Sequence, residues 1–332
     1  MPPDRVELTP VSTKLKDSNG QTVPELDDSP SSPMCSPDSP ALSQTGWTST
    51  SWPAAQLFVP KQGANASIDV GLHLTTEVLG RGSFSKVIKA RGLHGVYAVK
   101  LLRKGMPGDL EDEARILQKL NDPGNPNVIR LLGRWNGGLV FPIYEGTLTS
   151  AVAEFSAQWA QKQTDLSFTF EDLNGPLCGR QRWHDWAKQL ASGLAYVHSK
   201  HMVHGDLKPN NICYSPGRDR LVLTDFSTTV DDDAAFSLIY ASPSLRAGQT
   251  PSPDSDMYAL GVVLLFCATG TEPYGEAKNT QQRLLWMDKL VPQDSYSPEM
   301  CRHFANELPM LNELLSLTPV SATKFAADVA NS

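Results

Sequence analysis

The stretch HGDLKPNN, residues 204–211, decides the fold of this chain, because it places an aspartate, a lysine and an asparagine within six residues. Fourteen residues after Asn211, the run LTDFS, residues 223–227, contributes Asp225. Taken singly, each residue has a simpler interpretation, since a loop aspartate usually forms a turn and a lone asparagine usually caps a helix. The order and spacing of the surrounding motifs therefore have to decide whether these residues are structural or functional.

The chain around this stretch has a helical pattern from Thr147 onward. Residues 255–270, SDMYALGVVLLFCATG, are apolar nearly all round, which fits a helix buried in a core. Residues 181–200 instead carry one apolar face, typical of an amphipathic helix. That face consists of Trp183, Trp186, Leu190, Leu194 and Val197.

The part before Thr147 consists of short, β-branched runs separated by turns. These runs are LTTEVLG (74–80), KVIKA (86–90), VYAVKLL (96–102), VIRLLGRW (128–135) and GLVFPIY (138–144). They predict a small, mainly antiparallel sheet. One helix is expected at 109–120, where an apolar stripe begins at Leu110 and acidic residues crowd the first turn. The pattern predicts an α+β fold with a small β-rich lobe at about 67–144 and a larger helical lobe at about 145–332.

A glycine-containing loop, GRGSFSKV at residues 80–87, joins the first two expected strands. Glycines let the backbone approach a phosphate closely, although this motif taken alone is weak and is more often a plain hairpin turn than a nucleotide-binding loop. Thirteen residues after Val87 comes Lys100 at the end of a strand, and thirteen further on Glu113 lies on the helix. In this order, the three elements resemble the N-lobe of a protein kinase.

The second half of the chain strengthens the resemblance. Residues 204–211 match the H-R-D-x-K-x-x-N motif except at the second position, and residues 223–227 resemble D-F-G. Residues 256–261 resemble the start of the buried kinase helix, and residues 127–131 resemble the run after the N-lobe helix. The chain is identified as a member of the eukaryotic-type protein kinases over roughly residues 72–325. The resemblance implies a bilobal kinase-like fold. A small-molecule kinase fits the same motifs less well.

The resemblance implies ATP-dependent transfer of the γ-phosphoryl group to Ser or Thr of protein substrates, with Mg²⁺ as the metal. Asp206 would accept the proton of the attacking hydroxyl, and Lys208 two residues later is typical of Ser/Thr kinases. Asn211 and Asp225 would hold the magnesium ions. An insertion is expected at about 162–180, because the link between two family helices is long here.

The nucleotide site is also placed by the resemblance. Lys100 would hold the α- and β-phosphates, oriented by Glu113, and Phe141 falls at the gatekeeper position. The hinge hydrogen bond to adenine is assigned to Tyr144, because Pro142 has no N–H group. The implied nucleotide-binding residues are Leu79, Gly80, Gly82, Val87, Ala98, Lys100, Glu113, Phe141, Tyr144 and Cys213.

Four departures from the family pattern keep a second function open. Ser85 and Ser227 replace glycines, Gly205 replaces the arginine of H-R-D, and residues 242–244 read S-P-S instead of A-P-E. The arginine that normally pairs with the A-P-E glutamate falls at Ala322, so both ion-pair partners are absent. Because Gly205 removes a cation that pairs with a phosphate on the activation segment, we expect activity without phosphorylation there. The alternative to an active kinase is a pseudokinase that binds nucleotide as a scaffold.

Residues 1–66 differ in composition from the rest of the chain. They hold 10 of the 25 prolines and 16 serines or threonines, and they predict a disordered tail. Ser-Pro pairs occur at Ser29, Ser32, Ser36 and Ser39. They belong either to a plain flexible tail or to sites for an upstream proline-directed kinase.

The overall composition limits the partners, the membrane segments and the cysteine chemistry that we expect of this protein. A net charge of −7 gives no reason to expect nucleic acid as a partner. The longest apolar stretch, residues 257–268, is too short to span a bilayer, and the N-terminal residues do not resemble a secretory signal. Five widely spaced cysteines predict neither a zinc site nor a disulfide framework. We expect an intracellular protein, in cytoplasm or nucleus, without membrane insertion; its oligomeric state stays open.

Overall fold

The computed structural model describes residues 71–331, except residues 83, 107–108, 163–174, 216, 218 and 228–237 and the side chain of residue 331. The expected tail at 1–66, with its Ser-Pro pairs, lies outside the described residues. The lobe boundaries at 67, 144 and 145 stay predictions.

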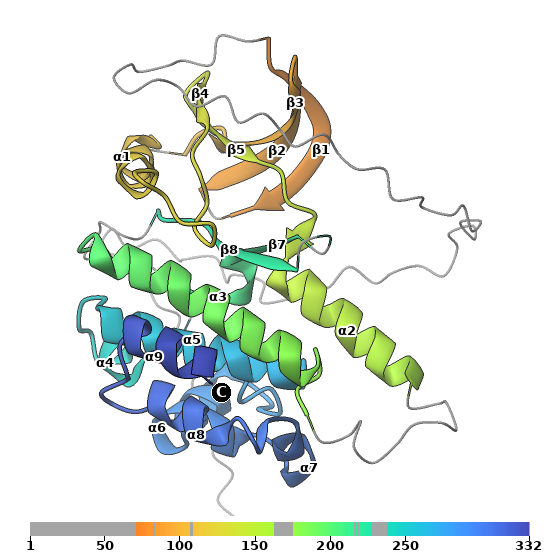
Figure 1. Cartoon of the computed structure of the whole chain (residues 1–332), viewed down its shortest axis with the longest axis vertical. Coiled ribbons are helices and arrows are strands. Elements are labelled where there is room, and N and C mark those ends of the chain that lie inside the picture. The colour runs from red at the N-terminus through yellow and green to blue at the C-terminus, as the bar shows by residue number, and fades with distance from the viewer. Residues whose placement is uncertain are drawn as a thin grey trace, which may run out of the picture. The chain divides into compact units, whose positions relative to one another are not determined.

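The N-terminal lobe is built on one antiparallel sheet of five strands, in the order β1-β2-β3-β5-β4, with helix α1 beside it (Figure 1). The elements are β1 (His73–Arg81), β2 (Ser85–Gly92), β3 (Gly95–Leu102), α1 (Glu111–Leu120), β4 (Gly133–Trp135) and β5 (Gly138–Pro142). The expected small antiparallel sheet is therefore confirmed.

Alternation along β3 gives the sheet two different faces. Successive side chains of a strand point to opposite sides. Accordingly, Val99 packs in a small cluster with Val140, whereas Ala98 packs into the main core with Phe141. Ala98 pairs with Phe141 and Lys100 pairs with Leu139 across β3 and β5. The register thus puts Lys100 on the same face as Ala98.

Two N-lobe predictions differ in detail from the structure. The helix begins at Glu111 rather than 109, because the Asp109 carboxylate turns back to accept the Glu111 N–H at 2.9 Å. The predicted strand at 128–135 was wrong except for Gly133–Trp135. In residues 128–131 the backbone bonds go elsewhere: the Ile129 N–H donates to the Leu223 carbonyl and the Leu131 N–H to the Asn121 side chain.

The C-terminal lobe is mainly helical and lies below the sheet in Figure 1. Helix α3 packs against α5 and α9, and the Trp183 indole N–H donates to the Leu264 carbonyl of α5 at 2.9 Å. All five residues of its predicted apolar face are fully buried. The helices of the C-terminal lobe are α2 (Leu148–Lys162), α3 (Arg180–Ser199), α4 (Pro243–Arg246), α5 (Pro253–Thr269), α6 (Thr280–Lys289), α7 (Pro298–Cys301), α8 (Leu308–Leu314) and α9 (Ala322–Asn331). The long link expected near 162–180 falls between α2 and α3.

The ends of α5 are set by local chemistry. The Ser252 and Ser255 side chains form a reciprocal capping box, so the helix starts at Pro253, two residues before the predicted start. Gly270 ends it with φ of 74°, a left-handed conformation that glycine adopts without strain. Every residue from Ser255 to Thr269 is buried, which confirms the predicted core helix.

Sequence analysis missed a second, three-stranded sheet formed by β6 (Gly146–Thr147), β7 (Ile212–Ser215) and β8 (Arg220–Leu223). Strands of two to four residues are too short to produce a readable alternation. This sheet lies between the N-lobe sheet and α3 in Figure 1 and carries the segments that follow the 204–211 stretch. Of the helices in the described ranges, none combines the length and apolar character needed to cross a bilayer.

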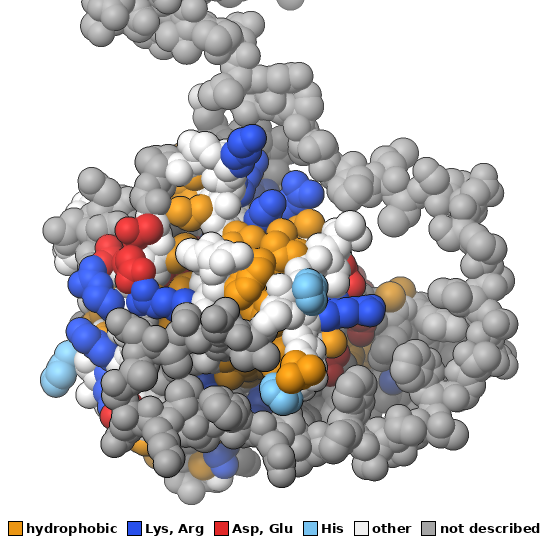
Figure 2. Space-filling model, turned by 90° about the horizontal axis from the view of Figure 1, so that it is seen from above, with side chains coloured by type: hydrophobic (Ala, Val, Ile, Leu, Met, Phe, Trp, Pro, Cys, Tyr) orange, Lys and Arg blue, Asp and Glu red, His pale blue; other side chains and the backbone are white. Residues whose placement is uncertain are grey.

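Seen from above in Figure 2, hydrophobic side chains gather near the centre of the described surface, with Lys and Arg side chains around them. Exposed apolar residues of the N-lobe strands include Leu74, Val78 and Val96.

Candidate active site

Three charged residues from distant parts of the chain meet between the lobes. The Lys100 Nζ of β3 lies 2.8 Å from Glu113 Oε1 and 2.7 Å from Glu113 Oε2 of α1. The same Nζ donates to Asp225 Oδ1 at 2.7 Å. Lys100 and Glu113 are buried, whereas the Asp225 side chain is 39% exposed. The structure therefore brings together the predicted phosphate-binding lysine, its partner glutamate and the predicted metal-binding aspartate.

The pKa values of this cluster follow from burial and charge. Burial favours neutral Lys100, but the Glu113 and Asp225 carboxylates outweigh it and raise the pKa of that amine above its ordinary value. Burial raises the pKa of Glu113, which Lys100 offsets only in part. Burial would also raise the pKa of Asp225, but Lys100 and the Ser227 hydroxyl lower it overall. Asp225 is thus held as a carboxylate at neutral pH.

Ser227 makes a contact that sequence analysis missed. Its hydroxyl donates to Asp225 Oδ1 at 2.8 Å, the same oxygen that accepts from Lys100. The other oxygen, Oδ2, accepts no hydrogen bond from any residue that the structure describes. Asp225 itself has φ of 63°, an uncommon conformation for a residue with a side chain and one found often at functional sites. Sequence showed only that a serine replaced a glycine here.

The 204–211 stretch forms a second polar cluster. Asp206 Oδ2 accepts from the Lys208 Nζ at 2.5 Å and from the Asn211 Nδ2 at 3.1 Å. Asn211 Nδ2 also donates to the Asp206 carbonyl at 2.9 Å. Because both bonds use the amide nitrogen, the orientation of Asn211 leaves its Oδ1 atom as a hard oxygen donor. Asp206 and Asn211 are buried, and Lys208 is half-buried.

This stretch is tied to the core by the buried Asp256 of α5. Its carboxylate accepts the His204 N–H at 2.8 Å and the Gly205 N–H at 3.0 Å, and contacts His198 Nε2 at 2.9 Å. Gly205 has φ of 81°, which suits glycine better than the arginine found in most of the family. The departure at Gly205 therefore leaves the loop anchored.

The structure shows where five residues of the predicted adenine slot lie, and the slot itself stays a prediction. Val87, Tyr144 and Cys213 are half-buried and pack on the same core that holds Ala98 and Phe141. Burial raises the pKa of the Cys213 thiol to about 12, so that it stays protonated and unreactive at neutral pH.

The glycine loop lies at the end of β1. Leu79 and Gly80 are in β1, and Gly80 pairs with Val87. The Gly82 N–H donates to the Ser85 carbonyl at 2.9 Å. Leu79 is exposed, so its predicted contact with adenine stays a prediction.

The family model described as protein kinase domain matches residues 74–319. The chain belongs to the protein kinase family. This kinase is 26% identical over 261 residues to serine/threonine-protein kinase A-Raf of Mus musculus, covering 72% of this chain and 38% of that protein. It is 27% identical over 220 residues to mitogen-activated protein kinase kinase kinase 7 of Homo sapiens, covering 63% and 33%. It is 30% identical over 155 residues to mitogen-activated protein kinase kinase 1c of Physcomitrium patens, covering 39% and 44%. The matched segments span less than half the length of these curated relatives.

The structure tests only some of the other departures from the kinase sequence pattern. Ser244 bonds through its hydroxyl to Ser242 at 2.8 Å, and Ala322 is buried, so both positions are neutral as expected. Whether they are neighbours stays a prediction. The activation-segment prediction concerns residues 228–237, which lie outside the described residues.

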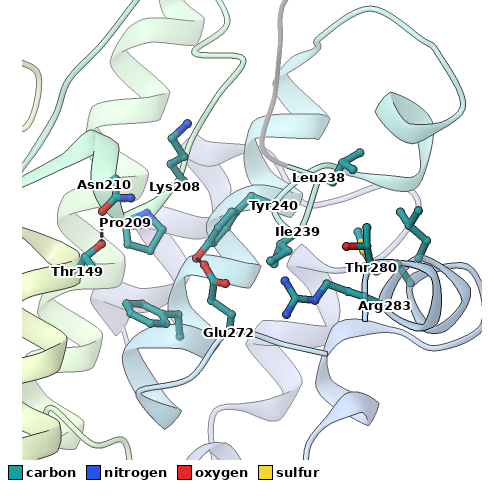
Figure 3. A pocket seen from close by; sticks show the side chains of 13 residues that line it. Thr149, Lys208, Pro209, Asn210, Leu238, Ile239, Tyr240, Glu272, Thr280 and Arg283 are labelled. Atoms are coloured by element: carbon teal, nitrogen blue, oxygen red, sulfur yellow. Dashed lines mark hydrogen bonds between the residues drawn. The ribbon is translucent and has the colours of Figure 1, made fainter. Parts of the chain in front are cut away.

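A pocket of about 700 Å³ beside the predicted catalytic loop, residues 204–211, was not predicted from the sequence. Figure 3 shows Lys208, Pro209 and Asn210 on one side of it and Leu238, Ile239 and Tyr240 on the other. Helix α6 closes the far wall with Arg283 and neighbouring side chains. Its walls come from segments far apart in sequence, and no local pattern brings them together.

Proposed function

We propose that this chain is an active serine/threonine protein kinase that uses ATP and Mg²⁺, rather than a pseudokinase. The observation that supports it most is the bonded cluster of Lys100, Glu113 and Asp225 together with the Asp206–Asn211 pair. The two groups are linked next to Asp225, where the Thr224 N–H donates to the Asn211 carbonyl at 2.9 Å. Each position at which the family does its chemistry is occupied by a capable side chain that is held by hydrogen bonds. Two observations favour Ser or Thr as the acceptor: the similarity to A-Raf, which is named a serine/threonine-protein kinase, and Lys208 two residues after Asp206.

The donor set fits a magnesium–nucleotide complex. The described residues contain no cluster of three or more His, Cys, Asp or Glu that could hold a metal by themselves. Asp225 Oδ2 and Asn211 Oδ1 are two hard oxygen donors, and Mg²⁺ is commonly bound by one or two protein oxygens together with phosphate and water. ATP with Mg²⁺ would supply the transferred phosphoryl group and balance its charge.

The residues of the chain then have separate tasks. Lys100 brings a positive charge to the phosphates, and Glu113 fixes the position of its amine from behind. Asp206 would accept the proton of the substrate hydroxyl as the hydroxyl oxygen bonds to the γ-phosphorus, while the bond from that phosphorus to the departing ADP oxygen breaks. Lys208, bonded to that carboxylate, offers a cation on the side where the acceptor arrives. Positioning and charge compensation account for most of the catalysis expected of such a site.

Phosphotransfer by the purified full chain tests the proposal. With ATP, Mg²⁺ and a generic Ser/Thr substrate such as a basic protein, the wild type should incorporate phosphate. Asp206→Asn should lower kcat by about 10²–10⁴-fold, since it removes the base, and Asp225→Ala should abolish turnover. Asp185→Asn is the matched control, because that exposed α3 aspartate contacts Gln181 and not the cleft.

Nucleotide binding alone does not separate the two functions, because a pseudokinase also binds ATP. A wild-type protein that binds ATP in a thermal-shift assay and transfers no phosphate to any Ser/Thr acceptor would establish the pseudokinase alternative. Equal rates for the wild type and Asp206→Asn would show that the base is wrongly assigned.

A further inference from the structure

The ion pair that the family pattern places at the end of the activation segment has no partner residue in this chain. Ser244 stands at the glutamate position and Ala322 at the arginine position, and both side chains are neutral. Because both charges are absent, no buried charge is left unpaired. The attachment of residues 238–247 to the rest of the C-lobe therefore depends on other groups.

Arg246, the last residue of α4, connects three segments of the C-lobe. Its Nη1 atom donates to the Ala241 carbonyl at 2.6 Å, and its Nη2 atom donates to the Met287 carbonyl of α6 at 3.0 Å. Its side chain also hydrogen-bonds to Tyr258 of α5, which opposes the rise that burial causes in the pKa of that phenol. The guanidinium is half-buried, and within the described part of the chain it bonds to neutral oxygens and to no carboxylate.

The two carbonyls that accept from Arg246 lie at helix ends. Met287 is in the last turn of α6, and the Leu290 N–H donates to the Trp286 carbonyl instead. Ala241 lies just before α4. Among the described residues, neither the Ala241 nor the Met287 carbonyl accepts a backbone N–H from a turn or loop. A cation that donates to the last turn of a helix also faces the negative end of the helix dipole. Arg246 therefore supplies a hydrogen bond that the backbone does not.

The segment that Arg246 holds faces the predicted catalytic loop. Figure 3 shows residues 238–240 across from Lys208, whose Nζ donates to Asp206 Oδ2 at 2.5 Å. Of the hydrogen bonds between described residues, the one from Arg246 is the one that joins residues 238–247 to α6. A protein hydroxyl that reaches Asp206 passes between the catalytic loop and this segment, so the position of the segment affects how the acceptor is held.

We propose that Arg246 is a positioning residue for the protein acceptor. Its guanidinium holds residues 238–241 against α6 and takes the place of the ion pair that is absent at positions 244 and 322. This inference rests on the proposed kinase function and concerns the acceptor alone, because the groups assigned to the nucleotide, Lys100 and Asp225, do not contact Arg246.

Steady-state phosphotransfer by the full chain tests this role, with a basic protein as the acceptor and both KM values measured. Arg246→Ala should raise the KM for the acceptor about tenfold and leave the KM for ATP within about twofold. Arg246→Lys should recover part of the loss, because an ammonium can donate to one carbonyl but lacks the planar fork that reaches both. Arg302→Ala, a change at an exposed arginine just after α7, is the control and should leave both KM values unchanged.

Thermal unfolding of the same samples separates positioning from loss of the fold. Arg246→Ala should lower Tm, because two carbonyls lose their donor. Arg246→Met keeps an apolar stem of similar length without donors, so it should preserve more of the packing and still raise the KM for the acceptor. All assays are run well below the lowest Tm of the set.

The contrary results are distinct from a failure of the proposed function. An unchanged acceptor KM in Arg246→Ala, equal rises of both KM values, or a wild-type acceptor KM in Arg246→Met would each give Arg246 a structural role only. Any of them would overturn this inference while phosphotransfer by the wild type upholds the kinase function. A wild type that transfers no phosphate would overturn the proposed function, and this inference with it.

Discussion

At the scale of single residues, two departures from the family pattern have local structural roles. Gly205 lies in a left-handed conformation with its N–H bound to Asp256, and Ser227 donates to Asp225 Oδ1. Neither removes a group that the proposed chemistry needs. The departures that looked like signs of a pseudokinase are therefore compatible with an ordered catalytic cleft.

The Ser227 bond leads to the first prediction. Ser227→Ala should raise the pKa of Asp225 toward its ordinary value, because one of the donors that stabilise the carboxylate is lost. A carboxylate whose pKa is lowered by folding stabilises the native state above its unfolded pKa of 3.8, and this contribution disappears as the pH falls through the folded pKa. We expect a loss of about 1 kcal/mol at pH 7, less than a buried charged bond because water reaches both groups.

Urea unfolding checks this prediction at two pH values. The difference between the wild type and Ser227→Ala should be present at neutral pH and should vanish in strong acid, below the folded pKa of Asp225. Ser227→Thr keeps the hydroxyl and serves as the control. A difference that persists unchanged in strong acid would mean that the hydroxyl acts on something other than the Asp225 charge.

At the scale of elements, the buried helix α5 organises the C-lobe. Its C-terminal end meets the last residues of the α2–α3 link, where the Leu177 N–H donates to the Ala268 carbonyl at 2.8 Å. Gly270 is required at this point for two reasons. Its φ is 74°, and a Cβ there would lie 2.6 Å from Ser156 Oγ and 2.9 Å from Leu177 Cδ2.

Gly248 provides the comparison for the second prediction, since its φ is 84° but no atom lies within 4 Å of an added Cβ. Gly248→Ala should cost about 1–2 kcal/mol, the strain of the left-handed conformation alone. Gly270→Ala should cost about 1–3 kcal/mol more, because α2 and the link must move to admit the methyl group. Chemical denaturation of both variants measures their free energies of unfolding. Equal losses of stability would show that the residues around Gly270 move aside without cost.

At the scale of the whole molecule, both lobes share one continuous core. The main cluster runs from Ala98 and Phe141 of the N-lobe sheet to Phe325 and Val329 of α9. The catalytic loop is attached to this core through Asp256, which lies some fifty positions further along the chain. The cleft is therefore held by the fold around it and not by the loop sequence alone.

This attachment gives the third prediction. Asp256→Asn should destabilise the protein by about 2–4 kcal/mol and lower kcat, because one amide oxygen cannot replace a carboxylate that accepts from His204 and Gly205. Asp254→Asn, an exposed change two residues earlier on α5, should cost below about 1 kcal/mol and leave kcat unchanged. Denaturation and phosphotransfer measured on the same samples check both. If Asp256→Asn were destabilised but kept full activity, the geometry of residues 204–211 would not depend on the bonds to Asp256.

The sequence by itself determined the family, the two lobes, the core faces of α1, α3 and α5, and the identity of the charged residues in the cleft. Local periodicity and motif spacing carry this information, because the residues that decide it are neighbours along the chain. The prediction of a strand at 128–135 was wrong because it also relied on local sequence alone. Its apolar run is readable locally, but its backbone bonds go to Leu223 and Asn121, which no local pattern reveals.

Tertiary structure alone decided which atoms meet. Lys100 reaches Asp225 across 125 positions of sequence, and the Ser227 hydroxyl shares the same carboxylate oxygen. The pocket beside residues 204–211 joins residues 208–210, residues 238–240 and α6. Such contacts depend on long-range packing and on exact side-chain directions, which spacing along the chain does not encode. Motif spacing along the chain therefore indicated the chemistry of the site, and packing determined which atoms each side chain contacts.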